Sequence, residues 1–329
     1  VVQEFDGEGI DSIAVCLLHS YANSTHEELV ADIVRDVLSD VTVVLSSEVL
    51  SEFREYERVS TAVINAYLQP IMGEYIRTLE RELDDIGIQS DVQIMQSNGG
   101  LMTADTATQK SVHTLLSGPA AGVLAGQFIG SLSDTEDVIT FDMGGTSADI
   151  CAIRQGEPEY STENTIEQHP VRVPMVDVNA IGAGGGSIAW IDAGGALRVG
   201  PKSAGAYPGP ICYGRGGDQP TVTDAHLLLG RLNPNHLLGG ELEVEYDATQ
   251  RIVERELADP LGMSPREVAE GILDVVTSNM ARGIRVVSVE RGYDPRTFSL
   301  IAFGGAGPLH ATRLIRELDM AEAIIPVTP

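Results

Sequence analysis

The chain has 329 residues, 48 acidic and 21 basic side chains, and a formal net charge of −27. A hydrophobic content of 43% excludes an acidic disordered chain, and the length is enough for two domains with sizeable cores. A surface this negative repels nucleic acids, so any phosphate ligand needs a local binding site. Only Lys110 and Lys202 are lysines. An acidic, lysine-poor surface suits high salt and predicts a halophilic source whose protein unfolds in low salt.

The sequence shows no sign of export or membrane insertion. No apolar run reaches the roughly 18 residues of a transmembrane helix, and the first five residues do not resemble a signal peptide. Cys16, Cys151 and Cys212 have neither disulfide nor zinc spacing, which fits inert packing in a reducing cytoplasm. Because the chain starts without methionine and ends abruptly at Pro329, we expect a fragment truncated at both ends.

The first elements alternate between strand and helix. Residues 12–18 predict a buried strand, and residues 41–45 predict a second one. Between them, Ser24 and Glu27 predict a capping box that starts a helix ending near Leu38. This order is typical of an α/β protein.

Two helices with different surfaces follow. A long amphipathic helix is predicted over about 60–86, and Pro70 is expected to kink or split it. After a strand at 92–96, the small residues of Ser117–Gly126 predict a helix from Pro119 that packs very closely on a neighbour. The apolar face of the long helix comprises Ile64, Tyr67, Leu68, Ile71, Tyr75, Leu79 and Leu83.

A charged linker, Ser131–Asp137, precedes a strong strand at 138–142, and we place a domain boundary in this linker. Residues 182–220 contain twelve glycines and four prolines. Within them, 187–192 and 196–199 predict a hairpin.

The last part predicts a helix, a strand and a helix. Ser264 and Glu267 form a predicted capping box at the start of the first helix. A strand at 298–303 then runs into a glycine-rich turn at 304–307, and a helix begins at Pro308.

The strand at 138–142 ends in the first candidate site. Asp142 is followed by Gly144, Gly145, Thr146 and Ser147. Consecutive N–H groups of such a turn can bind phosphate, the hydroxyls can donate to phosphate oxygens, and the carboxylate can hold Mg²⁺ through water. The alternative is a β-hairpin with a glycine turn that the aspartate only caps.

The turn after the last strand is the second candidate. Gly304, Gly305, Ala306 and Gly307 precede a helix N-terminus, where glycines would let a flat ligand lie on the backbone. A tight turn in which the glycines are only geometric is an equal alternative.

The third candidate is the segment 182–187, with Gly184, Gly185 and Gly186 and with Asp177 shortly before it. Glycine this dense is costly to order, which a flexible lid or a ligand loop would justify. An irregular surface excursion is the alternative.

Two histidines and an aspartate complete the candidates. Asp224 and His226 could bind a metal or act as acid and base, although a capping or packing role is the simpler explanation for this spacing. His310 lies in the predicted last helix and suits a structural or ligand-lining role.

Taken together, these motifs resemble one superfamily. Asp142-Met-Gly-Gly-Thr-Ser-Ala-Asp149 resembles the second phosphate loop of actin-like ATPases, Phe303–Pro308 their adenosine loop, and Ser117–Gly126 their first connecting helix. More specifically, the chain is similar to the hydantoinase A, 5-oxoprolinase and acetone carboxylase β-subunit family. The similar segments are Gln96–Leu101, Leu116–Gly122, Phe141–Asp149, Ile181–Ala189, Gly205–Pro210, Val222–His226, Leu229–Arg231 and Phe303–Ala311.

The resemblance implies an α/β protein of the actin-like (ribonuclease H-like) ATPase fold, with mixed sheets flanked by helices. It implies the ATP-binding subunit of an ATP- and Mg²⁺-dependent hydrolase of cyclic amides or imides, of hydantoinase or 5-oxoprolinase type. Such a subunit phosphorylates the carbonyl oxygen of a small-molecule substrate, and a second subunit of hydantoinase B type completes hydrolysis. The alternatives are an acetone carboxylase-type β subunit and a non-catalytic ATP-binding regulator on the same fold.

The resemblance also assigns residues and domains. It makes 1–131 the end of a first ATPase domain with its connecting helix, 132–136 a linker, and 137–329 a second domain with the insertion 182–220. The first phosphate loop and the second connecting helix are absent, so we expect the chain alone to be inactive. Asn179 stands where the family often has histidine. The implied roles are catalysis for Asp142 and Asp224, metal binding for Asp142, ATP binding for Gly144, Gly145, Thr146, Ser147, Gly304, Gly305, Ala306 and Gly307, and substrate or loop roles for Asp177, Asn179, Gly184, Gly185, Gly186 and His226.

Overall fold

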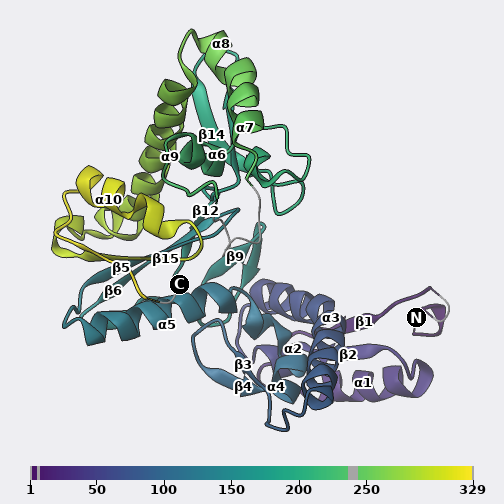
Figure 1. Cartoon of the computed structure of the whole chain (residues 1–329). Coiled ribbons are helices and arrows are strands. Elements are labelled where there is room, and N and C mark those ends of the chain that lie inside the picture. Colours follow the sequence, from purple (N-terminus) through teal and green to yellow (C-terminus); the bar gives the residue numbers. More distant parts are fainter. Residues whose placement is uncertain (1, 6–7, 236–243, 328–329) are drawn as a thin grey trace. The chain divides into compact units, whose positions relative to one another are not determined.

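The computed structural model describes residues 2–5, 8–235 and 244–327 (Figure 1). The chain forms two compact α/β units, one from residues 1–121 and 160–177, the other from 122–159 and 178–329. Helix α5 (Ser117–Leu132) contains the first change of unit, so this division falls inside a helix and not in the predicted linker. No helix among the described residues is both long and apolar enough to cross a membrane.

The first unit begins with the predicted strand, helix and strand. β1 (Ser12–Val15) pairs in parallel with β2 (Thr42–Leu45), and α1 (Thr25–Val37) connects them. Helix α3 (Glu55–Asp85) packs against both strands. The other elements of this unit are η1 (Val2–Glu4), α2 (Ser46–Val49), β3 (Gln93–Met95), β4 (Leu101–Thr103), α4 (Ala104–Gln109), η2 (Ser111–Thr114), β8 (Tyr160–Ser161), β9 (Asn164–Ile166), β10 (His169–Val171) and β11 (Met175–Val176).

The capping box predicted before α1 is wrong. Ser24 makes no side-chain cap, because the Glu27 carboxylate points inward instead. It accepts hydrogen bonds from the Leu17 N–H (2.8 Å), the Ser46 hydroxyl (2.7 Å) and the Ser47 N–H (3.0 Å). These partners come from other parts of the chain, so the local pattern around Ser24 could not reveal them.

Helix α3 is one continuous helix from Glu55 to Asp85, so Pro70 does not split it. The predicted apolar face is buried only in part: Ile64 packs against the core, whereas Tyr67, Ile71 and Tyr75 are 71%, 55% and 58% exposed. The helix instead buries small and hydrogen-bonding residues, which allow a close approach to the strands. These residues are Arg58, Thr61, Ala62, Asn65, Ala66, Gly73 and Ile76.

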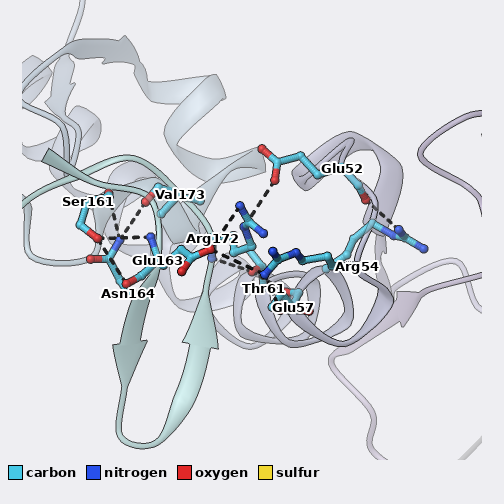
Figure 2. A network of polar contacts seen from close by, with 10 residues as sticks. Glu52, Arg54, Glu57, Thr61, Ser161, Glu163, Asn164, Arg172 and Val173 are labelled. Atoms are coloured by element: carbon cyan, nitrogen blue, oxygen red, sulfur yellow. Dashed lines mark hydrogen bonds and ion pairs between the residues drawn. The ribbon is translucent and has the colours of Figure 1, made fainter.

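A polar network ties the segment 160–177 to α3 (Figure 2). The backbone N–H of Arg172 donates to the Thr61 hydroxyl at 3.0 Å. The Arg172 guanidinium lies 3.4 Å from the Glu52 carboxylate and 3.8 Å from that of Glu163. These contacts therefore hold residues 160–177 in the first unit, although residues 122–159 before them belong to the second.

The second unit is built on a mixed six-stranded sheet in the order β12, β6, β5, β15, β16, with β7 added to β6. β5 pairs antiparallel with β6 and parallel with β15, which in turn pairs in parallel with β16. The strands are β5 (Val138–Met143), β6 (Ala148–Arg154), β7 (Glu157–Pro158), β12 (Asn179–Ile181), β15 (Ser299–Phe303) and β16 (Ala323–Ile324).

Helix α5 covers one face of this sheet (Figure 1). A Cβ on Gly126 would overlap the Thr140 side chain, and a Cβ on Gly130 would lie 3.0 Å from Val138. Thr140 and Val138 are alternate residues of β5 and therefore share a face. The prediction that the small-residue helix packs very closely on a neighbour is confirmed.

The opposite face carries the main core. There Ile139, Phe141 and Met143 join the buried side chains of α9 (Pro265–Val287) and α10 (Gly307–Glu317). The predicted Ser264 capping box at the start of α9 and the predicted hairpin of β13 with β14 are confirmed. Further elements are β13 (Ser187–Ile191), β14 (Leu197–Ser203), η3 (Ile211–Tyr213), α6 (Val222–Leu228), α7 (Tyr246–Val253), the π-helical η5 (Glu254–Ala258), α8 (Asp259–Leu261), η6 (Val289–Arg291) and η7 (Pro295–Thr297).

Candidate functional site

Three glycine-rich segments of the second unit meet at a cavity of about 450 Å³. They are the hairpin turn 144–147 between β5 and β6, the glycine loop 182–187 before β13, and the C-terminal turn 304–307 between β15 and α10. The sequence predicted each of them separately, and the fold brings them together. The cavity is lined by Gly144, Gly145, Thr146, Gly185, Gly186, Gly205, Ala206, Pro210, Tyr213, Thr223, His226, Leu232, Gly305, Ala306 and Leu309.

The hairpin turn places two carboxylates side by side at its base. The Gly144 N–H donates to the Ser147 carbonyl at 3.1 Å, and Asp142 stands opposite Asp149 in the register of β5 and β6. Burial raises the pKa of both carboxyls, and the charge of Asp142 raises that of Asp149 further. Within the described ranges neither carboxylate is paired with an arginine or lysine. A cation at this point would relieve their repulsion.

The glycine loop is a packed part of the site. Its Gly185 and Gly186 N–H groups donate to the carbonyls of Gly144 (3.0 Å) and Gly145 (2.6 Å) of the hairpin turn. A Cβ on Gly184 would lie 2.6 Å from the Gly145 backbone, so only glycine fits there. All three loop glycines are buried. The geometry therefore supports neither a flexible lid nor a surface excursion, and a ligand loop stays a prediction.

The C-terminal turn is fixed against the end of β5. Gly304 has φ +76°, and a Cβ there would overlap the Asp142 carboxylate. The Ala306 N–H donates to the Met143 carbonyl at 2.9 Å. The glycine at 304 is therefore required by backbone conformation and by space. The predicted order of strand, turn and helix is confirmed.

Three other glycines have no such structural reason. At Gly144, Gly145 and Gly305 the φ angle is not positive, and a Cβ would meet no atom of the described chain within 4 Å. All three line the cavity. The space that a side chain would occupy at these three positions is therefore open to a ligand in the cavity. It is not filled by another described part of this unit.

The hairpin turn also presents polar groups suited to an anion. Its carbonyls at Gly144 and Gly145 are engaged by the glycine loop, whereas the N–H groups of Gly145 and Thr146 donate to no described residue. The hydroxyls of Thr146 and Ser147 are adjacent in sequence. Such a turn can bind a phosphate group without any lysine.

Asp224 has a structural position. Its carboxylate accepts hydrogen bonds from the Thr221 N–H (2.9 Å), the Thr221 hydroxyl (2.7 Å) and the Cys212 N–H (2.8 Å). The side chain is fully buried, and burial raises the pKa of the carboxyl while these hydrogen bonds oppose the rise. The capping role considered for Asp224 is confirmed, and its geometry does not support the predicted catalytic role.

His226 lines the cavity and pairs with His310. Their Nε2 atoms lie 3.0 Å apart, and both rings are buried. Burial lowers the pKa of both imidazoles well below the usual range, the charge of His310 lowers that of His226 further, and Arg231 and Arg313 add to both shifts. Both imidazoles are thus neutral at pH 7, which disfavours acid–base catalysis by His226. Their separation of 84 residues hid this pair from sequence analysis.

Two further predicted site residues, Asn179 and Asp177, are not among those that line the cavity. The Asn179 amide donates to the Gly283 carbonyl of α9 at 3.0 Å, which fixes β12 to that helix. Asp177 ends the segment 160–177, which belongs to the first unit.

Two further residues, Asp149 and Thr223, contribute to the site. Asp149 belongs to a quoted motif, and its pairing with Asp142 follows once 144–147 is taken as the turn of a hairpin. Thr223 holds the glycine loop, because its N–H and hydroxyl both donate to the Gly185 carbonyl at 2.8 Å. No local spacing indicated this second contact.

Comparison with protein families gives two matches. The family model described as Hydantoinase/oxoprolinase matches residues 58–329, and the model of the Hydantoinase/oxoprolinase N-terminal region matches residues 1–38. The resemblance to the hydantoinase A, 5-oxoprolinase and acetone carboxylase β-subunit family is confirmed.

Individual relatives cover almost all of the chain. Caprolactamase subunit alpha of Pseudomonas jessenii is 42% identical over 325 residues, which are 99% of this chain and 47% of that protein. 5-oxoprolinase 1 of Arabidopsis thaliana is 36% identical over 99% of this chain and 28% of its own length. The chain thus spans about half, or less, of these curated relatives.

Two solved structures share the fold over 99% of the chain. The nucleotide-free structure of acetone carboxylase has a TM-score of 0.87 at 27% identity, with 46% of its chain covered. The crystal structure of ATP-dependent caprolactamase from Pseudomonas jessenii has a TM-score of 0.84 at 42% identity, with 47% covered.

Proposed function

Because the chain belongs to the hydantoinase/oxoprolinase family, we propose that it is the ATP-binding part of an enzyme that uses ATP to hydrolyse a cyclic amide. One observation carries the proposal. Gly144, Gly145 and Gly305 line a cavity, yet neither backbone conformation nor packing requires glycine at these positions. Room at both a phosphate-binding turn and a turn before a helix N-terminus suits a nucleotide.

The cavity offers one place for each end of ATP. The N–H groups of Gly145 and Thr146, with the hydroxyls of Thr146 and Ser147, would hold phosphate oxygens. Gly305, Ala306 and Leu309 line the cavity and would provide a partly apolar surface for the nucleoside. In this proposal Gly185 and Gly186 act through the hairpin turn, because they hold its carbonyls and so aim its N–H groups at the cavity.

Asp142 and Asp149 fit a magnesium site. Mg²⁺ keeps several waters and is typically held by one or two carboxylates and the phosphates of a nucleotide, and these two residues provide the carboxylates. When bound, Mg²⁺ would neutralise charge on the phosphates during transfer. No set of three acidic, histidine or cysteine side chains in the described ranges could hold a metal ion. In this proposal the phosphates of ATP supply the further ligands.

The chemistry follows from the stability of an amide. Transfer of the terminal phosphoryl group from ATP to the amide oxygen releases ADP and activates the amide carbon. Water then attacks that carbon and the ring nitrogen leaves as the amine, which opens the ring to an acyl phosphate, and a second water releases the carboxylate and inorganic phosphate. For this step the chain supplies positioning and charge neutralisation, which phosphoryl transfer needs most. A second subunit of hydantoinase B type would complete hydrolysis, and relatives named as subunits support such a partner.

The same proposal extends to the fold and the domains. The hairpin turn after β5, the C-terminal turn before α10 and the close-packed α5 suit the second domain of an actin-like ATPase. In that assignment the unit of residues 122–159 and 178–329, with the insertion 182–220, is the second domain, and the unit of residues 1–121 and 160–177 is the end of the first.

ATP-dependent carboxylation of a ketone is the second candidate. It is favoured by the structural likeness to acetone carboxylase at a TM-score of 0.87. A cyclic amide remains our first choice, because the caprolactamase subunit is 42% identical whereas the acetone carboxylase structure is 27% identical.

An assay of ATP hydrolysis tests the proposal. The complete gene product, expressed with any second subunit, would receive caprolactam, 5-oxoproline, hydantoin or acetone with bicarbonate. We expect one cyclic amide to stimulate ADP release and its own ring opening. Stimulation by acetone alone would favour the carboxylase, and ATP binding without stimulation by any substrate would favour a regulator. Absence of ATP binding would contradict the proposal as a whole.

A further inference from the structure

The histidine pair stands between the elements that hold the cavity. His226 is on α6 and His310 is on α10, and both helices pack against α9 (Figure 1). The two Nε2 atoms are 3.0 Å apart, the ring centroids are 4.7 Å apart, and the ring planes meet at 78°. This geometry allows one imidazole to donate its Nε2–H to the bare Nε2 of the other.

Filling this space with two histidines costs more free energy than filling it with apolar side chains. Each Nδ1 atom is buried and has no hydrogen-bond partner among the described residues. In a neutral pair one ring carries its proton on Nε2 and the other on Nδ1, so one buried N–H always lacks an acceptor. Two apolar side chains of similar size would avoid this penalty. Packing alone therefore does not account for two histidines here.

A metal ion does not account for them either. If both Nε2 atoms bound a cation, both protons would move to the unpartnered Nδ1 atoms, and two buried donors would lack acceptors. The charges of Arg231 and Arg313 also act on this pair and would repel a cation. Glu270 is an ion-pair partner of both arginines, and Asp274 lies 2.6 Å from Arg313.

Each helix of the pair holds a different side of the cavity. On the α6 side, Thr223 donates twice to the Gly185 carbonyl, and the glycine loop in turn holds the hairpin turn. On the α10 side, the helix begins at Gly307, directly after the C-terminal turn with Gly305 and Ala306. The hydrogen bond between His226 and His310 therefore links the two sides at the edge of the cavity.

We propose that His226 and His310 are positioning residues, which fix the distance between the phosphate-binding side and the nucleoside-binding side of the cavity. This inference rests on the proposed function, because it takes the cavity to be the ATP site. The pair acts through neutral imidazoles, so its effect on ATP is geometric and needs no charge on either ring.

Variants at His310 separate the hydrogen bond from packing. His310→Leu removes it. His310→Gln keeps a donor, because its amide nitrogen lies near the place of Nε2. We expect His310→Leu to weaken ATP binding by the complete protein about tenfold, as the loss of one hydrogen bond implies. His310→Gln is expected to stay within about twofold of the parent.

The double variant His226→Leu with His310→Leu guards against misfolding as an explanation. It leaves no polar atom unpaired, so we expect parent-like or higher resistance to urea together with the same weakened ATP binding. Parent-like ATP binding by this double variant would overturn the inference. Equal weakening by His310→Gln and His310→Leu would also overturn it, because the hydrogen bond would then not matter.

A second measurement needs no nucleotide. Amide hydrogen exchange at Gly185 and Gly186 should become faster in His310→Leu but not in His310→Gln, because only the leucine releases the α6 side. If the parent binds no ATP, the proposed function fails while this exchange still decides whether the pair fixes the loop. Unchanged exchange in His310→Leu would contradict the positioning role by itself.

Discussion

Two sets of glycines surround the cavity, and they differ in what requires them. Gly184 and Gly304 leave no space for a side chain, because hairpin-turn backbone or the Asp142 carboxylate lies where a Cβ would be. Gly144, Gly145 and Gly305 have open space and ordinary backbone angles. The first set builds the cavity and the second faces it. The contrast teaches that a glycine-rich motif can combine a requirement of the fold with a requirement of a ligand, and that only the structure separates them.

The largest expected effect is on the first set. Gly184→Ala would place a methyl group 2.6 Å from the Gly145 backbone, where neither loop can give way cheaply. We expect the free energy of unfolding to fall by about 3 kcal/mol, as for severe overpacking. Urea denaturation followed by circular dichroism measures this. A loss below about 1 kcal/mol would show that the two loops are not rigidly packed.

The carboxylates beside these glycines come next. Asp142→Asn removes one charge of the proposed magnesium site while keeping its shape. We expect ATP hydrolysis by the complete protein to fall about 100-fold or more, as for other groups that stabilise transition-state charge. Steady-state kinetics at saturating Mg²⁺ measure this fall. Asp224→Asn is the matched control. Because the Asp224 carboxylate is a buried hydrogen-bond acceptor, we expect this substitution to lower the free energy of unfolding and to leave the specific activity of the folded protein unchanged. Equal specific activity of folded Asp142→Asn and the parent would contradict the metal site.

The same carboxylates predict an effect of pH. Their pKa values are raised in the folded state, so protonation stabilises the fold, and stability contributed by the proton is lost as pH rises through the folded pKa. The stability of Asp149→Asn should therefore fall less than that of the parent as pH rises. Mg²⁺ with ATP should offset the fall in the parent but not in the variant. Thermal unfolding in steps from about pH 4, near the ordinary pKa of aspartate, to about pH 8 checks both expectations. A parent whose pH dependence matches that of Asp149→Asn would show that the two carboxyls do not interact.

The smallest effect on folding is expected in the second set. Gly145→Ala meets no neighbouring atom, so the free energy of unfolding should change by less than about 0.5 kcal/mol. ATP affinity should nevertheless fall about tenfold, because the methyl group occupies space kept for the phosphates. Isothermal titration beside urea denaturation compares the two. Unchanged affinity would remove the distinction between the two sets of glycines.

Local patterns predicted those parts of the fold that local forces decide. The Ser264 capping box, the hairpin of β13 with β14, and the close packing of α5 follow from neighbours in sequence. The buried face of α3 does not, because the Asn65 side chain is held by distant backbone, as when its oxygen accepts the Val112 N–H at 3.0 Å.

The site divides in the same way. Each glycine segment was found from its own residues, because clustered glycines mark a turn or a ligand loop in the sequence itself. Their assembly depended on contacts such as that between Gly185 and the Gly144 carbonyl, 41 residues apart in the numbering. The roles of Asp224 and His226 depended on Cys212 and His310, which no spacing in the sequence connects to them.

The central claim is that ATP binds in the cavity between the hairpin turn and the C-terminal turn. A crystal structure with Mg²⁺ and a non-hydrolysable ATP analogue tests it most directly. We predict phosphate density against Gly144, Gly145, Thr146 and Ser147, with the nucleoside beside Gly305 and Ala306. Nucleotide density elsewhere, with this cavity left to water, would contradict the account.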